Sequence, residues 1–216
     1  AVPQELSPQQ KKREKSMKKR TAVVKRKTTE TDIAVKLNID GSGKSKINTA
    51  IGFLDHMLEL FAFWGFFDLE ISAKGDLKVD IHHTNEDIGL VLGQAFKKAL
   101  DNKKGIKRIG YASAPMEEVI ANVVLDVNGR GFLSIPKALG FAADKKNGYE
   151  FDYAVHFLDG LAKQIGMNLN IELCNASNDL HVTLEPVFKA LGIALDQATQ
   201  IDPRRKVIPS TKGIID

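Results

Sequence analysis

The chain has a single cysteine, Cys174, in 216 residues, so it cannot form a disulfide within itself. This scarcity favours a reducing, intracellular setting. No run of eighteen or more apolar residues occurs, which argues against a membrane-spanning helix. The glycine-rich segment "GSGK" lacks the spacing of a phosphate-binding loop. Hydrophobic residues still make up 43% of the chain, enough for one sizeable domain or two small halves that share a core.

Positive charge is concentrated at the amino terminus. Residues 1–28 carry ten Lys and Arg against two Glu, whereas the rest of the chain is slightly acidic. We expect residues 1–24 to be a basic disordered tail, and it could be a solubilising leader, added sequence or the remnant of a transit peptide. This composition predicts a cytoplasmic protein, or a plastid protein in the last case. Nucleic acid is not the expected partner, because the body is acidic and has no groove-reading motif.

Hydrophobic periodicity outlines an ordered body that begins near Lys25. Period-two alternation predicts strands over 31–40, 68–73, 77–81, 119–129, 131–135 and 167–174. Helical spacing predicts helices over 51–65, 86–102, 153–166 and 185–198. The last helix is expected to start near Glu185, because Pro186 is best tolerated in a first turn. Residues 103–118, with Gly105 and Gly110, are expected to form a loop.

The chain repeats itself at an offset of about one hundred residues. His56 corresponds to His156 at an offset of 100, and His82 to His181 at an offset of 99. "HHTNE" in the first half faces "HVTLE" in the second. The sequence therefore predicts an α+β fold of two homologous halves, about 25–110 and 111–216, each a small sheet packed against helices.

All five histidines fall inside this repeat. In a helix, residues i and i+4 share a face, so His82 with Glu86, and His181 with Glu185, each present an imidazole and a carboxylate together. This donor set suits zinc, manganese or iron. His83 is rotated by about 100° and faces elsewhere, so one segment can supply ligands to two different metals.

Several long motifs in one order carry a resemblance to a known family. They are "TETDI", "GFLDHML", "HHTNEDIGLVLGQA", "GIKRIG", "PMEE", "LDVNGR", "HFLDGLA", "FKALGIAL" and "PSTKG". From about Lys25 to Ile215 the chain resembles the imidazoleglycerol-phosphate dehydratases. The resemblance implies a homo-oligomer, a 24-subunit shell, with two manganese ions in each active site between subunits. It implies metal ligands at His56, His82, His83, Glu86, His156, His181 and Glu185.

The resemblance also assigns the remaining roles. Glu30 is the acid/base candidate, and a small-molecule phosphate substrate would be held by Arg108, Arg130, Lys189, Ser210 and Lys212. The implied reaction is the dehydration of imidazoleglycerol phosphate to imidazole-acetol phosphate in histidine biosynthesis. Two metals on the ring nitrogens would favour an imidazolate, which expels hydroxide through a diazafulvene while a carboxylate moves the protons. Arg, Lys and Ser donors suit a phosphate dianion.

The chain departs from the family pattern at this expected site. Val182 stands where the second imidazole of the second half belongs; if the gap is moved, Leu180 and His181 take the two histidine positions and the spacing to Glu185 is broken. Either alignment lacks one imidazole, so one metal site is expected to be weakened. Leu60 replaces a glutamine, and Trp64 stands where a histidine is common. The alternative to an active enzyme is therefore a catalytically impaired paralogue with a structural or binding role in the same shell-forming fold.

Overall fold

The structure, a computed structural model, describes residues 19–136, 148–175 and 177–215. The first eighteen residues of the expected tail lie outside this range. The ordered body begins earlier than Lys25, because strand β1 (Thr21–Lys27) starts at Thr21. No helix within these described ranges has both the length and the apolar character needed to cross a membrane.

Two four-stranded sheets repeat the same topology. The first contains β1, β2 (Thr31–Asn38), β3 (Ser45–Asn48) and β4 (Asp68–Gly75) in the order β1-β2-β4-β3. The second contains β5 (Ile109–Met116), β6 (Val119–Asp126), β7 (Phe132–Ser134) and β8 (Asn168–Cys174) in the order β5-β6-β8-β7. In each sheet only the last pair of strands is parallel. The predicted α+β duplication is confirmed.

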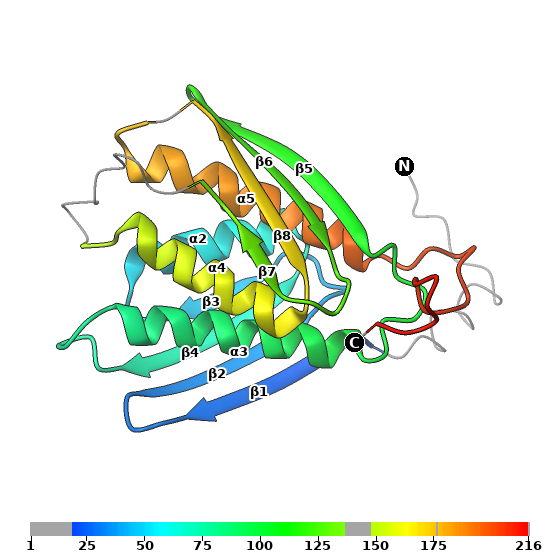
Figure 1. The fold of residues 1–216 in the computed structure, drawn as a ribbon. Helices are drawn as coiled ribbons and strands as arrows, with labels where there is room; N and C mark the ends of the chain where they lie inside the picture. The colour runs from blue at the N-terminus through cyan, green and yellow to red at the C-terminus, as the bar shows by residue number, and fades with distance from the viewer. Residues whose placement is uncertain (1–18, 137–147, 176, 216) are drawn as a thin grey trace, which may run out of the picture.

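The helices lie between the two sheets (Figure 1). They are α2 (Gly52–Trp64), α3 (His82–Leu100), α4 (Phe151–Ile165) and α5 (Leu180–Thr199). Helix α3 packs on β1 and β2 and against α4, while α5 packs on β5 and β6 and against α2. The inward residues of β2, such as Ile33 and Val35, are fully buried and alternate with more exposed residues. One continuous core therefore joins both halves.

Several elements differ from the sequence-based prediction. Strands β1, β3 and β5 were not predicted, and residues 77–81, predicted as a strand, contain a turn over 77–79 and no strand. Gly110 looked like a loop residue, but it lies within β5. Glycine is needed at this position because a Cβ would come 1.8 Å from the carbonyl oxygen of Ala194. The missing side chain lets α5 approach the strand closely.

Helices α3 and α5 begin earlier than predicted. The carboxylate of Asp179 accepts a hydrogen bond from the backbone N–H of His181, at 2.8 Å, and caps α5 at Leu180. Pro186 consequently lies inside α5 rather than in its first turn. Asp80 accepts the backbone N–H of His82 in the same way, at 3.1 Å. The histidines therefore stand in the first turns of their helices.

Candidate active site

Two imidazoles and a carboxylate converge between α2 and α5. The carboxylate oxygen Oε2 of Glu185 lies 2.8 Å from Nε2 of His181 and 3.4 Å from Nε2 of His56. The two imidazole rings stack, with centroids 5.1 Å apart. One donor atom from each residue lies within 4.8 Å of the other two. We call this group the α2–α5 cluster; its geometry fits a divalent cation that prefers nitrogen and oxygen ligands.

The carboxylate of this cluster is held in its charged form. Burial raises the pKa of Glu185, but hydrogen bonds from Lys189 and the two imidazoles outweigh burial and keep the pKa below its ordinary value. Lys189 Nζ lies 2.5 Å from Oε1 of Glu185, one helical turn away on α5. A deprotonated carboxylate is the form that a metal requires.

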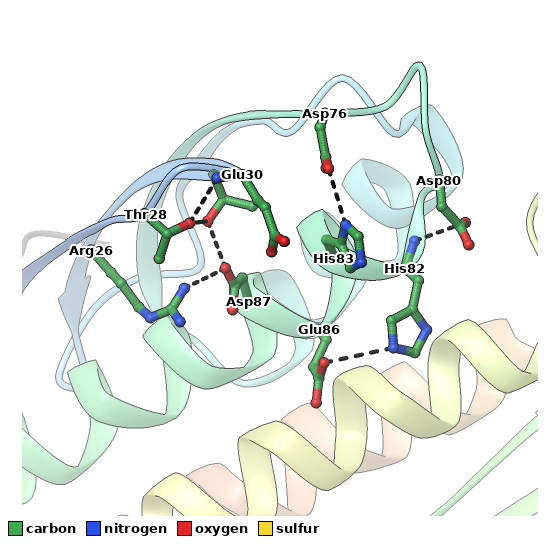
Figure 2. A network of polar contacts seen from close by, with 10 residues as sticks. Arg26, Thr28, Glu30, Asp76, Asp80, His82, His83, Glu86 and Asp87 are labelled. Atoms are coloured by element: carbon green, nitrogen blue, oxygen red, sulfur yellow. Dashed lines mark hydrogen bonds and ion pairs between the residues drawn. The ribbon is translucent and has the colours of Figure 1, made fainter.

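A second group, the α3–α4 cluster, contains His82, Glu86 and His156. His82 and His156 place their ring centroids 4.4 Å apart, and Nε2 of His82 lies 3.7 Å from Oε2 of Glu86. Figure 2 shows His82 and Glu86 side by side on α3. This cluster is looser than the α2–α5 cluster, because the carboxylate is too far from His82 for a hydrogen bond.

Each cluster combines the two halves of the chain. In the α2–α5 cluster, the first half supplies His56 and the second half supplies the His181–Glu185 pair. In the α3–α4 cluster the roles are exchanged. Because His181 pairs with Glu185 four residues on, as His82 pairs with Glu86, the geometry favours the alignment in which Val182 corresponds to His83.

His83 does not join the cluster of its neighbour His82. Its Nδ1 lies 3.0 Å from Oδ2 of Asp76, and this hydrogen bond raises the pKa of His83 above its ordinary value. The charge of Glu30, in the turn between β1 and β2, contributes in the same direction. Figure 2 shows Glu30, Asp76 and His83 gathered beside the first turn of α3. With Nδ1 engaged, Nε2 of His83 is the nitrogen left for a ligand.

The residues expected to hold phosphate are divided between two ends of the molecule. Lys189 adjoins the α2–α5 cluster. The backbone N–H of Arg108 instead donates to the carbonyl oxygen of Ala198, thirteen residues beyond Glu185 on α5 and therefore about 20 Å along the helix axis. In Figure 1, α3, α4 and α5 begin on the left, and the carboxyl-terminal segment lies on the right.

Three of the other phosphate candidates also belong to the far end. Arg108 donates to both carboxylate oxygens of Asp126, at 2.6 and 2.8 Å, and to the carbonyl oxygen of Pro209, at 2.7 Å. Next to Pro209, the Ser210 hydroxyl oxygen accepts the backbone N–H of Lys212. Arg130 lies in the turn between β6 and β7, beside the carboxyl end of α4. The single chain therefore does not bring these residues to either cluster.

The three residues that depart from the family pattern, Val182, Leu60 and Trp64, differ in how deeply they are buried. Val182 is buried, with 6% of its surface exposed, whereas the corresponding His83 is partly exposed. Leu60 is half-buried against the core, and Trp64 lies exposed at the carboxyl end of α2.

Sequence reasoning missed two carboxylates that support the first turn of α3. Asp76 orients His83, and Asp80 accepts both the backbone N–H of His82 and the hydroxyl of Tyr153, at 3.0 Å. Both residues lie shortly before the two histidines in the sequence. Their proximity to "HHTNE" was the signal available in the sequence. It was missed because a strand was predicted over residues 77–81, whereas the structure has a turn there that brings Asp76 back to His83.

The fold and the two clusters define a duplicated α+β protein with paired histidine–carboxylate groups. The family model "Imidazoleglycerol-phosphate dehydratase" matches residues 49–195. The chain belongs to this family.

Relatives and solved structures of the same family match most of the chain. The imidazoleglycerol-phosphate dehydratase of Thermoanaerobacter pseudethanolicus is 52% identical over 91% of this chain and 100% of its own, and that of Methanocella arvoryzae is 48% identical over 91% and 100%. A crystal structure from Pyrococcus furiosus, in complex with (S)-C348, is 32% identical with a TM-score of 0.75, and covers 88% of this chain and 99% of its own. A Staphylococcus aureus structure is 31% identical with a TM-score of 0.73, and covers 84% and 100%.

Proposed function

We propose that this protein is a carbon–oxygen lyase that dehydrates imidazoleglycerol phosphate to imidazole-acetol phosphate in histidine biosynthesis. The observation that carries this proposal is the convergence of His56, His181 and Glu185 in a chain about half identical to dehydratases over nearly its full length.

The donor atoms of the α2–α5 cluster lie close enough together for a divalent cation, and the α3–α4 cluster offers the same donor types. Manganese is the metal proposed from the resemblance. His56, His181 and Glu185 would hold one ion, and His82, Glu86 and His156 the other. His83, which faces away from the α3–α4 cluster, would be a ligand to a different cation. Bound cations would stabilise negative charge on the imidazole ring of the substrate and so acidify the adjacent carbon-bound proton.

The protein's own side chains would bind the phosphate and move protons. Glu30, beside His83, is the candidate acid/base group, because an exposed carboxylate next to the cation site can accept a proton from carbon. Lys189, Arg108, Arg130, Ser210 and Lys212 would hold the phosphate. The four cationic side chains would neutralise the dianion, and the Ser210 hydroxyl would help to fix its orientation.

The separation between these groups supports a homo-oligomer. Arg108 lies about 20 Å along α5 from the α2–α5 cluster, whereas a small substrate spans much less. If both groups act in one site, a second copy of the chain must supply one of them. A 24-subunit shell, as implied by the resemblance, would provide such sites.

The outer face of the second sheet also supports self-association. Ile109, Tyr111, Ile120 and Val124 are exposed there, with Tyr111 and Val124 paired across β5 and β6. The corresponding face of the first sheet instead carries exposed ion pairs, such as the one between Lys36 and Glu70. An exposed apolar patch of this kind is typical of a protein interface.

Because Val182 stands where an imidazole is expected, we expect the two cation sites to be unequal. The same difference supports a second candidate function. With one ligand fewer, one site would bind manganese more weakly than the other. A chain that has lost this site altogether would be an impaired paralogue, with a structural or binding role in the shell.

Metal content combined with turnover tests these alternatives. The full chain is purified with manganese, and manganese per chain is measured together with dehydration of imidazoleglycerol phosphate. About two ions per chain with turnover is the expected result. One ion and no turnover would favour the impaired paralogue. Glu185→Gln should lose manganese and activity, whereas Glu70→Gln, which alters an exposed carboxylate on the first sheet, should match wild type.

A further inference from the structure

Asp87 joins α3 to both strands of the β1–β2 hairpin. It lies on α3 one turn after His83, and only 8% of its surface is exposed. Its Oδ2 accepts hydrogen bonds from the Arg26 guanidinium on β1 and from the Thr31 hydroxyl on β2, the latter at 2.5 Å. Figure 2 shows Arg26 and Asp87 facing one another below the hairpin turn. One carboxylate therefore holds both ends of the turn.

The turn between these strands is fixed in its own right. The Thr28 hydroxyl oxygen accepts the backbone N–H groups of Glu30, at 3.1 Å, and of Thr31, at 3.0 Å. The Thr28 backbone N–H donates to the carbonyl oxygen of Thr31 at 2.8 Å. Residues 28–31 consequently form one rigid unit. The hydrogen bond between Thr31 and Asp87 anchors this unit to α3 and thereby positions Glu30 beside His83.

The second half of the chain provides an internal comparison. In the β1–β2 ladder Arg26 pairs with Ile33, and at the equivalent position of the β5–β6 ladder Ala114 pairs with Ala121. Ala114 therefore corresponds to Arg26. By the same register, Val119 corresponds to Thr31. On the helices, Pro186 follows Glu185 as Asp87 follows Glu86.

All three counterparts in the second half are buried and carry no polar side-chain group. Ala114, Val119 and Pro186 lie where β5 and β6 pack on α5, just as β1 and β2 pack on α3. Packing a hairpin on its helix therefore does not require a charged contact in this fold. Removing the Asp87 carboxylate from water is costly, and Arg26, with 34% of its side chain exposed, is only partly buried beside it, so the polar contact in the first half needs another reason.

We propose that Asp87 is a positioning residue: with Arg26 and Thr31 it holds residues 28–31 against α3 and so fixes the Glu30 carboxylate relative to His83. This inference rests on the proposed acid/base role of Glu30. Asp87 touches neither cluster and acts through the turn. The polar contact is present only in the half that carries both Glu30 and a second adjacent histidine.

Asp87→Asn is the first test. The neutral amide keeps the shape of the side chain but weakens its hold on Arg26 and Thr31. We expect kcat to fall about 10- to 100-fold, in the range found for residues that orient catalytic groups, with KM and manganese per chain unchanged. Hydrogen exchange of the residue 30 and 31 amides should become faster. Asp32→Asn, which removes only the exposed ion pair with Lys27 in the same hairpin, should leave all four quantities unchanged.

A double-mutant comparison distinguishes positioning from a general structural effect. In the Glu30→Gln background, Asp87→Asn should lower kcat no further, because the group that it positions is already absent. An equal loss of kcat in both backgrounds would overturn the proposal. So would wild-type exchange of the turn amides in Asp87→Asn.

A triple variant, Arg26→Ala with Thr31→Val and Asp87→Ala, covers the case in which Asp87→Asn fails to fold. It copies the apolar contact of the second half, so it should fold and show the same loss of kcat; full activity would overturn the proposal. If wild type itself does not dehydrate the substrate, the proposed function fails instead. Amide exchange would still report whether Asp87 fixes the turn.

Discussion

Asp68, at the start of β4, holds the loop that precedes β3. Its Oδ1 accepts the backbone N–H groups of Ser42, at 2.8 Å, and Lys44, at 3.2 Å. Burial raises the pKa of Asp68, but these hydrogen bonds and one from Asn38 outweigh burial and bring the pKa below 3.8. The charged carboxylate therefore stabilises the loop.

The pH dependence of stability should report this carboxylate. Because the pKa of Asp68 is lowered in the folded state, its contribution is complete above 3.8, the unfolded value, and is lost as pH falls through the folded pKa. We expect Asp68→Asn to lower the free energy of unfolding by about 1 kcal/mol near neutral pH. The difference from wild type should shrink at about pH 2. Urea unfolding at both pH values measures it, and a constant difference would contradict this account.

Val182 is the residue at which the chain can be brought back to the family pattern. Val182→His should raise manganese retention during dialysis, because it restores an imidazole at the position that corresponds to His83. The valine is buried, so the new side chain must turn outward to bind. Val182→Gln is the control, since it has similar bulk and no imidazole. Equal retention in both variants would argue that position 182 does not face a cation site.

At the scale of elements, the packing of α3 on α4 depends on Gly89. A Cβ at this position would come 2.4 Å from the carbonyl oxygen of Phe157. The neighbouring residue on α4 is His156, which meets His82 of α3 in the α3–α4 cluster. The distance between the two helices therefore sets the distance between two proposed ligands.

Gly89→Ala should weaken both the fold and one cation site. The added methyl group forces the helices apart, which costs about 1–3 kcal/mol of stability. We expect a lower melting temperature and reduced manganese binding by calorimetry, with the α2–α5 cluster still occupied. Gly52→Ala is the matched control, because its Cβ would meet no atom within 4 Å. Equal loss at both clusters would show that the effect is not local.

The elements that the sequence predicted are those with a strong local pattern. Strand β2 alternates cleanly, and the middle of α3 repeats apolar residues at helical spacing. Strand β5 was missed because Gly105 and Gly110 suggested a loop, although Gly110 allows the close approach of α5. The start of α5 was predicted too late because it depends on a single hydrogen bond to the Asp179 side chain, and hydrophobic periodicity carries no information about such a contact.

At the scale of the whole molecule, the site was predicted only in part. The spacing of His82 to Glu86, and of His181 to Glu185, indicated the pairs that one helical turn brings together. The joining of His56 to the second pair depends on how the two halves pack, because 129 residues separate His56 from Glu185. The resemblance named these residues as ligands, but it did not indicate how they divide between two clusters.

Mixed oligomers test whether one active site uses two copies of the chain. Glu185→Gln and Arg130→Ala would each inactivate every site in its own oligomer. If the cluster and the arginine come from different copies, oligomers assembled from both variants contain some intact sites. We expect the mixture to be clearly more active than either variant alone, measured after denaturation and joint refolding. Activity no higher than the separate variants would place both groups in one copy.

The exchange of side chains between the halves has a consequence for how such a protein could arise. A peptide of half this length, pairing with its twin around a two-fold axis, would already contain two equivalent sites, since each would draw on both partners. Fusion of the twins frees the sites from that symmetry. A substitution in one half would then alter one site and leave its counterpart unchanged, so the two sites of a fused chain could come to differ, as we propose for Val182.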